Sequence, residues 1–217
     1  MVAKTYINNI QDFKGPDGLW TKYVFFSIGE RSSTRSYTLW KNVNYRTKEE
    51  GLWQHKHPDY VDSRNLFIDY QIFTDWCQCE FGYTSKDNSG RFWHLDKDLI
   101  NHGNKNYSPD TCMFVPNEIN KLLSFSKGRQ GDYPLGVYLH SGKYKAQISN
   151  GENKRIYLGH FNDPRVAHKA WQEAKISVIE SILDRGYIQG HEKLLKSLQA
   201  HIDRLENDIK NNLETVS

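Results

Sequence analysis

The chain has 217 residues, a formal net charge of +3 and 13% aromatic residues. This length allows one domain of ordinary size or two small ones. The three cysteines, Cys77, Cys79 and Cys112, are too few and too irregularly spaced for a disulfide framework, and they form no CxxC pair for zinc. No apolar run reaches the ~18 residues of a membrane helix, and the N-terminus carries no apolar signal segment. We therefore expect a soluble intracellular protein with no membrane partner.

Short aromatic runs alternate with turn signals in the first 90 residues. The GPDG sequence at 15–18 predicts a turn, residues 23–26 and 37–40 are typical of strands, and the polar stretch 44–64 predicts a loop. Residues 67–76 place their large apolar side chains on one helical face, which predicts a helix. A strand stays open for the same residues, because Ile68, Tyr70 and Ile72 also alternate. The face of the predicted helix consists of Ile68, Ile72, Phe73 and Trp76.

The pattern changes after residues 124–132, a polar, glycine-containing segment that predicts a linker. Residues 136–148 and 155–161 alternate with a period of two, which predicts three strands of a sheet with one solvated face. The side chains expected on that face are Tyr138, His140, Lys143, Lys145, Gln147, Arg155 and Tyr157. Lysine and arginine neutralise phosphates, and arginine and glutamine can pair with base edges, so this face favours DNA binding. An ordinary solvated sheet face is the alternative interpretation.

Two helices are expected after the strands. Asp163 suits an N-cap and Pro164 suits the first helical position. The apolar face of that helix consists of Ala167, Ala170, Trp171, Ala174, Val178 and Ile182. The last segment carries a narrow apolar stripe of Leu195, Leu198, Ile202, Leu205 and Ile209. Such a stripe predicts either docking onto the protein's own body or a homodimer.

Residues 136–175 resemble the DNA-binding domain of plant ethylene-response (APETALA-type) factors and their phage relatives. The matching positions are Gly136-Val137, Gly142-Lys143-Tyr144, Ala146, Ile148, Tyr157-Leu158-Gly159, Phe161, Ala167, Ala170, Trp171 and Ala174. The resemblance implies a three-stranded sheet that lies in the major groove of double-stranded DNA. It also implies that the seven side chains of the solvated face match the family's contact face.

Residues 94–120 combine an acidic strand, a polar loop, a short apolar strand and a helix start. This order, a β-hairpin and then a helix, is typical of small metal-dependent nuclease sites. A carboxylate on the first strand and a polar ligand on the helix can face the same divalent ion.

The same block resembles the core of phage HNH-type homing endonucleases. Leu95-Asp96-Lys97 stands where the family has its Asp-His pair, Thr111-Cys112 matches its Asn-Leu turn, and residues 114–120 match its strand-to-helix step. The resemblance implies that Asp96 and Asn120 bind a divalent metal, with Mg²⁺ expected, and that Lys97 replaces the general-base histidine. His94 is the alternative base, because residues two apart on a strand project from the same face.

Together these patterns predict an α+β protein. We expect a degenerate ββα-metal (HNH-like) core, a three-stranded antiparallel sheet packed on one helix, and a C-terminal helix. The expected domains are 1–123 with the core at about 91–123, a linker at 124–132, the DNA-binding domain at 133–185 and the helix at 191–217. The expected function is divalent-metal-dependent DNA cleavage of the phage homing type, in the host bacterial cytoplasm if the gene is phage-encoded. The alternative is a catalytically degenerate DNA-binding, regulatory or host-interaction protein.

Overall fold

The computed structural model describes residues 6–14, 20–27, 34–48, 57, 60–123, 132–151 and 154–216. Its fold class is α+β, as the sequence predicts. The chain divides into two compact units, Met1–Val115 and Pro116–Ser217. The predicted turn at 15–18 and residues 124–131 of the predicted linker lie outside the described residues.

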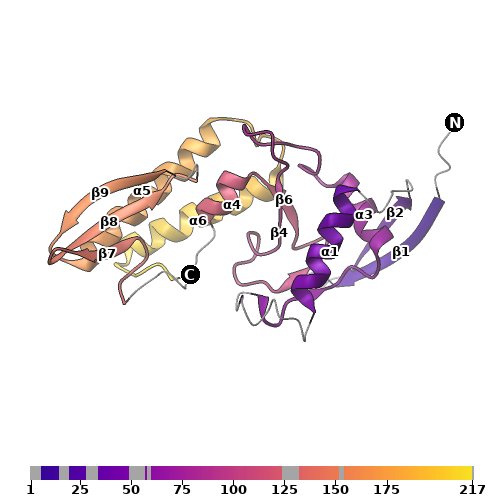
Figure 1. Cartoon of the computed structure of the whole chain (residues 1–217), viewed down its shortest axis with the longest axis horizontal. Coiled ribbons are helices and arrows are strands. Elements are labelled where there is room, and N and C mark those ends of the chain that lie inside the picture. The colour runs from indigo at the N-terminus through magenta and orange to yellow at the C-terminus, as the bar shows by residue number, and fades with distance from the viewer. Residues whose placement is uncertain are drawn as a thin grey trace. The chain divides into compact units, whose positions relative to one another are not determined.

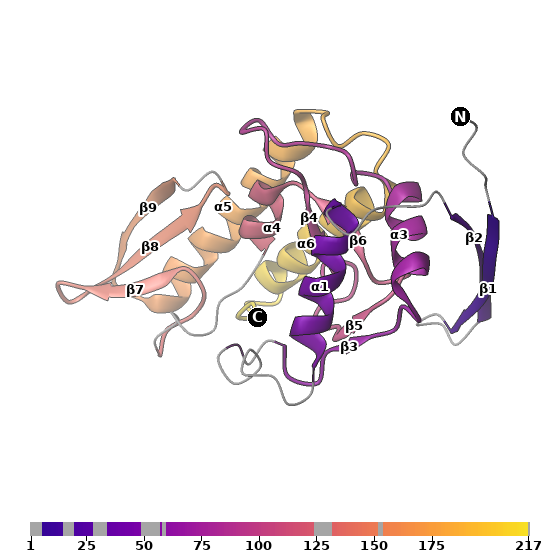
Figure 2. The same ribbon diagram turned by 45° about the vertical axis from the view of Figure 1, so that its right-hand side comes forward.

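The first unit begins with the antiparallel strands β1 (Tyr6–Lys14) and β2 (Trp20–Ser27), and β2 includes the strand predicted at 23–26. Helix α3 (Tyr70–Cys79) packs against β2 and against α1 (Arg35–Thr47) (Figures 1 and 2). The helix expected within 67–76 is therefore present, starting at Tyr70. The side chain of Asp69 caps its start by accepting a hydrogen bond from the Ile72 N–H at 2.8 Å.

Helix α1 corrects the sequence prediction for residues 37–40, which we expected to form a strand. Thr34 caps the helix, and its hydroxyl accepts from the Tyr37 N–H. The ring of Trp40 packs against Phe73 of α3, with ring centroids 5.4 Å apart. Tertiary packing of aromatic side chains thus overrides their local preference for strands. The predicted loop at 44–64 also begins late, because α1 continues to Thr47.

Two small strand pairs complete the first unit. β3 (Arg64–Asn65) pairs in parallel with β5 (Asn106–Tyr107), and β4 (His94–Asp96) pairs antiparallel with β6 (Met113–Val115). Trp76 of α3 stacks on Phe114 of β6, with ring centroids 5.7 Å apart. This aromatic core, which also buries Phe67 and Phe73, fixes the hairpin that carries Asp96.

The second unit contains the predicted sheet. Strands β7 (Val137–His140), β8 (Lys143–Ser149) and β9 (Arg155–Phe161) pair antiparallel in that order. Helix α5 (Pro164–Asp184) packs against one side of the sheet (Figure 1). The core between sheet and helix is built around Val137, Ala146 and Ala167. We call the side of the sheet that faces away from α5 the outer face.

Helix α5 starts as the sequence predicts, since Asp163 accepts from the Arg165 N–H at 2.7 Å and Pro164 occupies the first turn. Its buried face is wider than predicted. Ala167, Trp171 and Ile182 are buried, but Ala170, Ala174 and Val178 are only half-buried. The additional buried residues are His168, Gln172, Lys175 and Ile179. They are covered because further elements of this unit pack on a second side of α5.

These further elements are α4 (Asn117–Leu123) and α6 (Glu192–Lys210). The Lys175 ammonium donates a hydrogen bond to the Leu122 carbonyl, and Arg185 forms an ion pair with Glu118 at 3.4 Å. Helix α6 packs against α5 and buries Leu198, Ile202 and Leu205 of the predicted stripe, with Leu195 and Ile209 half-buried. The stripe therefore docks onto the protein's own body.

Across the described ranges, no helix has both the length and the apolar character needed to cross a membrane.

Candidate nucleic-acid interface and catalytic residues

The outer face brings together the seven side chains that the sequence predicts there. Directly paired residues of neighbouring strands project to the same side of a sheet. Tyr138 pairs with Lys145, and His140 pairs with Lys143. Gln147 pairs with Tyr157, and Ser149 pairs with Arg155. Lys145 and Gln147 are half-buried in the central strand, and the other five side chains are exposed.

His160 also lies on the outer face, and the sequence prediction missed it. Strict alternation along β9 would place Arg155 and Tyr157 on one side and His160 on the other. A register shift between Ala146 and Gln147 of β8 inserts one extra residue into β9, so that Lys145 pairs with His160. The only sequence feature that marks this bulge is Gly159, the residue before His160. The φ angle of Gly159 is +134°.

The bulge builds an aromatic and basic cluster. The Tyr157 hydroxyl and His160 Nδ1 are 2.5 Å apart, and the rings of His140 and His160 have centroids 5.5 Å apart. The Lys145 ammonium lies 5.7 Å from the centroid of the Tyr157 ring. None of the residues in β7, β8 and β9 carries a carboxylate. The outer face therefore combines positive charge with flat rings and no opposing acid.

Asp96 is half-buried at the end of β4. Its Oδ1 accepts hydrogen bonds from the backbone N–H groups of Asp98 at 3.0 Å and Leu99 at 2.8 Å. Burial of the carboxyl group, and then the negative charge of Asp98, raise the pKa of Asp96 to about 6. A carboxyl group with a strongly raised pKa is a candidate functional group, although this one also closes a turn.

Lys97 is buried, with 6% of its surface exposed. Its ammonium donates to Asp98 Oδ2 at 3.0 Å and to the Asn104 carbonyl at 2.9 Å. A lysine that acts as a base would have to lose its positive charge, and that would remove the ion pair with Asp98. His94, two residues before Asp96 on β4, is exposed and is the more accessible of the two candidate bases.

Thr111 and Cys112 occupy the turn that the resemblance assigns to a structural Asn-Leu pair. The Thr111 hydroxyl donates to the Asn106 carbonyl at 2.7 Å and accepts from the Ser108 N–H at 3.2 Å. Thr111 thus holds the loop before β6 closed. Burial raises the pKa of the Cys112 thiol to about 12, so this cysteine is an inert core residue.

Arg46 is a second residue that the sequence prediction missed, because it lies within the expected loop. Its guanidinium lies over the Tyr60 ring at 5.2 Å and bonds to the Tyr107 hydroxyl. Burial opposes its charge, but Tyr107, Tyr60 and the nearby carboxyl of Asp96 together raise the pKa of Arg46. Helix α1 therefore brings a permanent positive charge near Asp96, which no local sequence pattern indicates.

The predicted metal ligands come from different units, with Asp96 on β4 of the first and Asn120 on α4 of the second. Their oxygen atoms are the donors that Mg²⁺ prefers. The positive charges of Arg46 and Lys97 near Asp96 disfavour a cation there. In the part of the chain that the structure describes, no three His, Cys, Asp or Glu side chains gather into a metal-binding group.

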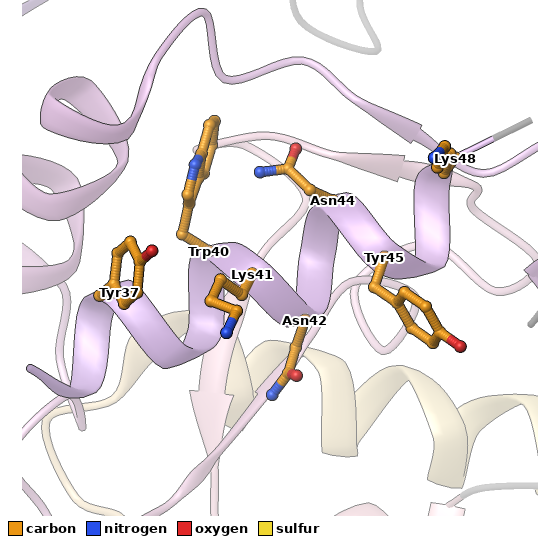
Figure 3. A pocket seen from close by; sticks show the side chains of 7 residues that line it. All are labelled: Tyr37, Trp40, Lys41, Asn42, Asn44, Tyr45 and Lys48. Atoms are coloured by element: carbon orange, nitrogen blue, oxygen red, sulfur yellow. The ribbon is translucent and has the colours of Figure 1, made fainter. Parts of the chain in front are cut away.

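A surface pocket of about 460 Å³ lies along α1 (Figure 3). Its lining residues are Tyr37, Trp40, Lys41, Asn42, Asn44, Tyr45 and Lys48. Figure 3 shows Trp40 and Asn44 pointing to one side of the helix and Asn42 and Tyr45 to the other. The polar groups do not converge on a common point, so we assign no ligand to this pocket.

Comparison with models of known protein families, with curated proteins and with solved structures finds no match to this chain. Its function is therefore inferred from its own side chains and their arrangement.

Proposed function

We propose that this protein binds double-stranded DNA through the outer face of the β7–β9 sheet. The observation that carries the proposal is the set of cations on that face, Lys143, Lys145 and Arg155, with no carboxylate in the three strands. Cations that neutralise DNA phosphates release condensed counterions, and this release is a large part of binding free energy.

The chemistry of the face supports the same ligand. The major groove of B-DNA admits a helix or a two-stranded ribbon, and it displays base edges to side chains that enter it. Gln147 on the central strand and Arg155 on β9 have the amide and guanidinium groups that pair with adenine and guanine. Exposed Tyr138 and Tyr157 add flat surfaces beside them.

Replacing both Lys145 and Arg155 by alanine tests the proposal. We expect weaker binding to every duplex sequence, because the attraction between a cation and a phosphate does not depend on the base sequence. The slope of log K against log salt should fall by roughly 0.9 for each phosphate that the variant no longer neutralises. Fluorescence anisotropy over a series of salt concentrations measures both quantities.

The matched control replaces Lys196 and Lys210 of α6 by alanine. Both are exposed and belong to the same unit, so this variant removes the same charge outside the sheet. If the Lys145→Ala/Arg155→Ala variant binds as well as this control and the wild type, the outer face is not the DNA-binding surface.

The second candidate function is divalent-metal-dependent DNA cleavage, and Asp96 is the observation that favours it. Its carboxyl is held at the end of β4, in a β4–β6 hairpin that α4 follows in the chain. Asp96 would be a ligand of the ion, which when bound would polarise the scissile phosphate. His94 would accept the proton of the attacking water, and Lys97 would remain a fixed positive charge.

A plasmid-nicking assay with Asp96→Ala tests this candidate. We expect the wild type to nick DNA with Mg²⁺ but not with a chelator, and Asp96→Ala to nick at least about 100-fold more slowly. Asp96→Ala nicking at the wild-type rate would exclude the assignment. If the wild type binds DNA but never nicks it, the first unit is a degenerate core that serves as a scaffold.

A further inference from the structure

Two histidines meet on the outer face although they come from opposite edges of the sheet. His140 lies on β7 and His160 on β9, and their ring centroids are 5.5 Å apart. Both residues are exposed. The bulge in β9 is what turns His160 toward His140, so the pair exists only in the folded sheet.

The groups that face this pair are cationic or aromatic. β8 contributes Lys143, which pairs with His140, and Lys145, which pairs with His160. β9 contributes Arg155 and Tyr157, and β7 contributes Tyr138. Helix α5 covers the opposite side of the sheet, where His168 and Lys175 are buried, and Asp163 is occupied as its N-cap. The other charged residues of α5, Arg165, Lys169, Glu173, Glu180 and Asp184, are exposed and belong to the helix on that opposite side. No carboxylate of the described strands stands beside the imidazoles to hold them protonated.

Protonation of His160 would add a positive charge, and it would also change the hydrogen bond between His160 and Tyr157. A neutral imidazole that accepts at Nδ1 uses the only hydrogen of the Tyr157 hydroxyl, at 2.5 Å. A protonated imidazole donates through Nδ1 instead, so the bond reverses and the phenol hydrogen becomes available to another acceptor. One proton taken up by His160 thus adds one positive charge and one outward donor.

We propose that His140 and His160 link DNA binding to pH, with protons taken up at these imidazoles when the phosphate backbone docks on the outer face. This inference rests on the proposed DNA-binding function. Histidine is the side chain whose ordinary charge change lies closest to physiological pH, and a nearby phosphate favours its charged form. DNA affinity therefore rises as the pH falls.

The test measures affinity of the full chain for a random-sequence duplex that carries a pH-insensitive dye, at fixed ionic strength. We expect the wild-type affinity to rise by about tenfold from about pH 8 to about pH 6. In the His140→Gln/His160→Gln variant we expect a change of less than about twofold over the same range. Tyr157→Phe should keep part of the pH dependence, because it removes the donor but not the imidazole charge.

His201→Gln is the matched control, since His201 lies on α6 and not in the sheet. It should keep the wild-type pH dependence. All variants retain the buried His168, so circular dichroism at each pH separates unfolding from a loss of binding. A double variant with the wild-type pH dependence, or a wild type with none, overturns this inference while DNA binding itself stands. No binding at any pH overturns both.

Discussion

At the residue scale, His168 shows how a buried polar side chain ties the end of the chain to the sheet domain. Its Nε2 accepts from the Thr215 N–H at 3.0 Å, so Nδ1 carries the hydrogen and donates to the Leu135 carbonyl at 2.9 Å. The Thr215 hydroxyl donates in turn to Asp208 Oδ2 at 2.8 Å. The network needs a neutral imidazole, because a protonated Nε2 could not accept the Thr215 bond.

This requirement predicts a pH dependence of stability. Burial lowers the pKa of His168, so the unfolded chain takes up the proton before the folded chain does as the pH falls. The stability contributed by the neutral imidazole is fully present above the ordinary value of about 6.5 and declines as the pH falls below it. Urea unfolding at a series of pH values should show this decline in the free energy of unfolding.

His168→Gln provides the comparison. It should be less stable than the wild type at neutral pH, by about 1–3 kcal/mol, because buried partners are left without their hydrogen bonds. Its stability should vary less with pH between about 5 and 7. Equal pH dependence in the two proteins would show that other groups dominate the acid sensitivity.

At the element scale, α6 carries an apolar stripe that is covered by α5 of the same chain. Leu194 and Leu198 are fully buried, and Ile202 and Leu205 are nearly so. In proteins most of the stability of an amphipathic helix comes from tertiary packing of its apolar face, so packing against α5 supplies most of the stability of α6. The covered stripe leaves little apolar surface on this side of α6 for a dimer.

Leu198→Ala tests this arrangement against Leu213→Ala as the matched control, because Leu213 is 51% exposed. We expect Leu198→Ala to lower the free energy of unfolding by about 2–5 kcal/mol and the control to change it by less than about 0.5 kcal/mol. Light scattering should show the same monomeric mass for both. A wild-type dimer that Leu198→Ala converts to a monomer would instead support pairing of two α6 helices.

At the scale of the whole molecule, the proposed binding and cleavage residues fall in separate compact units. The outer face belongs to the second unit and Asp96 to the first. Asp96→Ala should therefore bind DNA with wild-type affinity even if it no longer nicks it. Asn120 is the exception to this separation, because α4 belongs to the second unit and its Glu118 is ion-paired with Arg185.

The sequence by itself determined the elements whose signals are local. Alternation along 137–161 predicted the three strands and most of the outer face, and Asp163-Pro164 predicted the start of α5. These predictions were correct because the faces of a strand and the cap of a helix depend on residues only a few positions away in the sequence. The apolar spacing within 195–209 predicted α6, and it left open what covers its stripe.

Only the tertiary structure decided the rest. Residues 37–40 became helical because Trp40 packs on α3, and a one-residue bulge against β8 moved His160 to the outer face. The packing of α1 brought Arg46 near Asp96, and Lys97 was buried against Asp98 and Asn104. Each of these outcomes depends on a partner residue that the fold supplies. Side-chain packing and strand register select that partner, and no local sequence pattern specifies it.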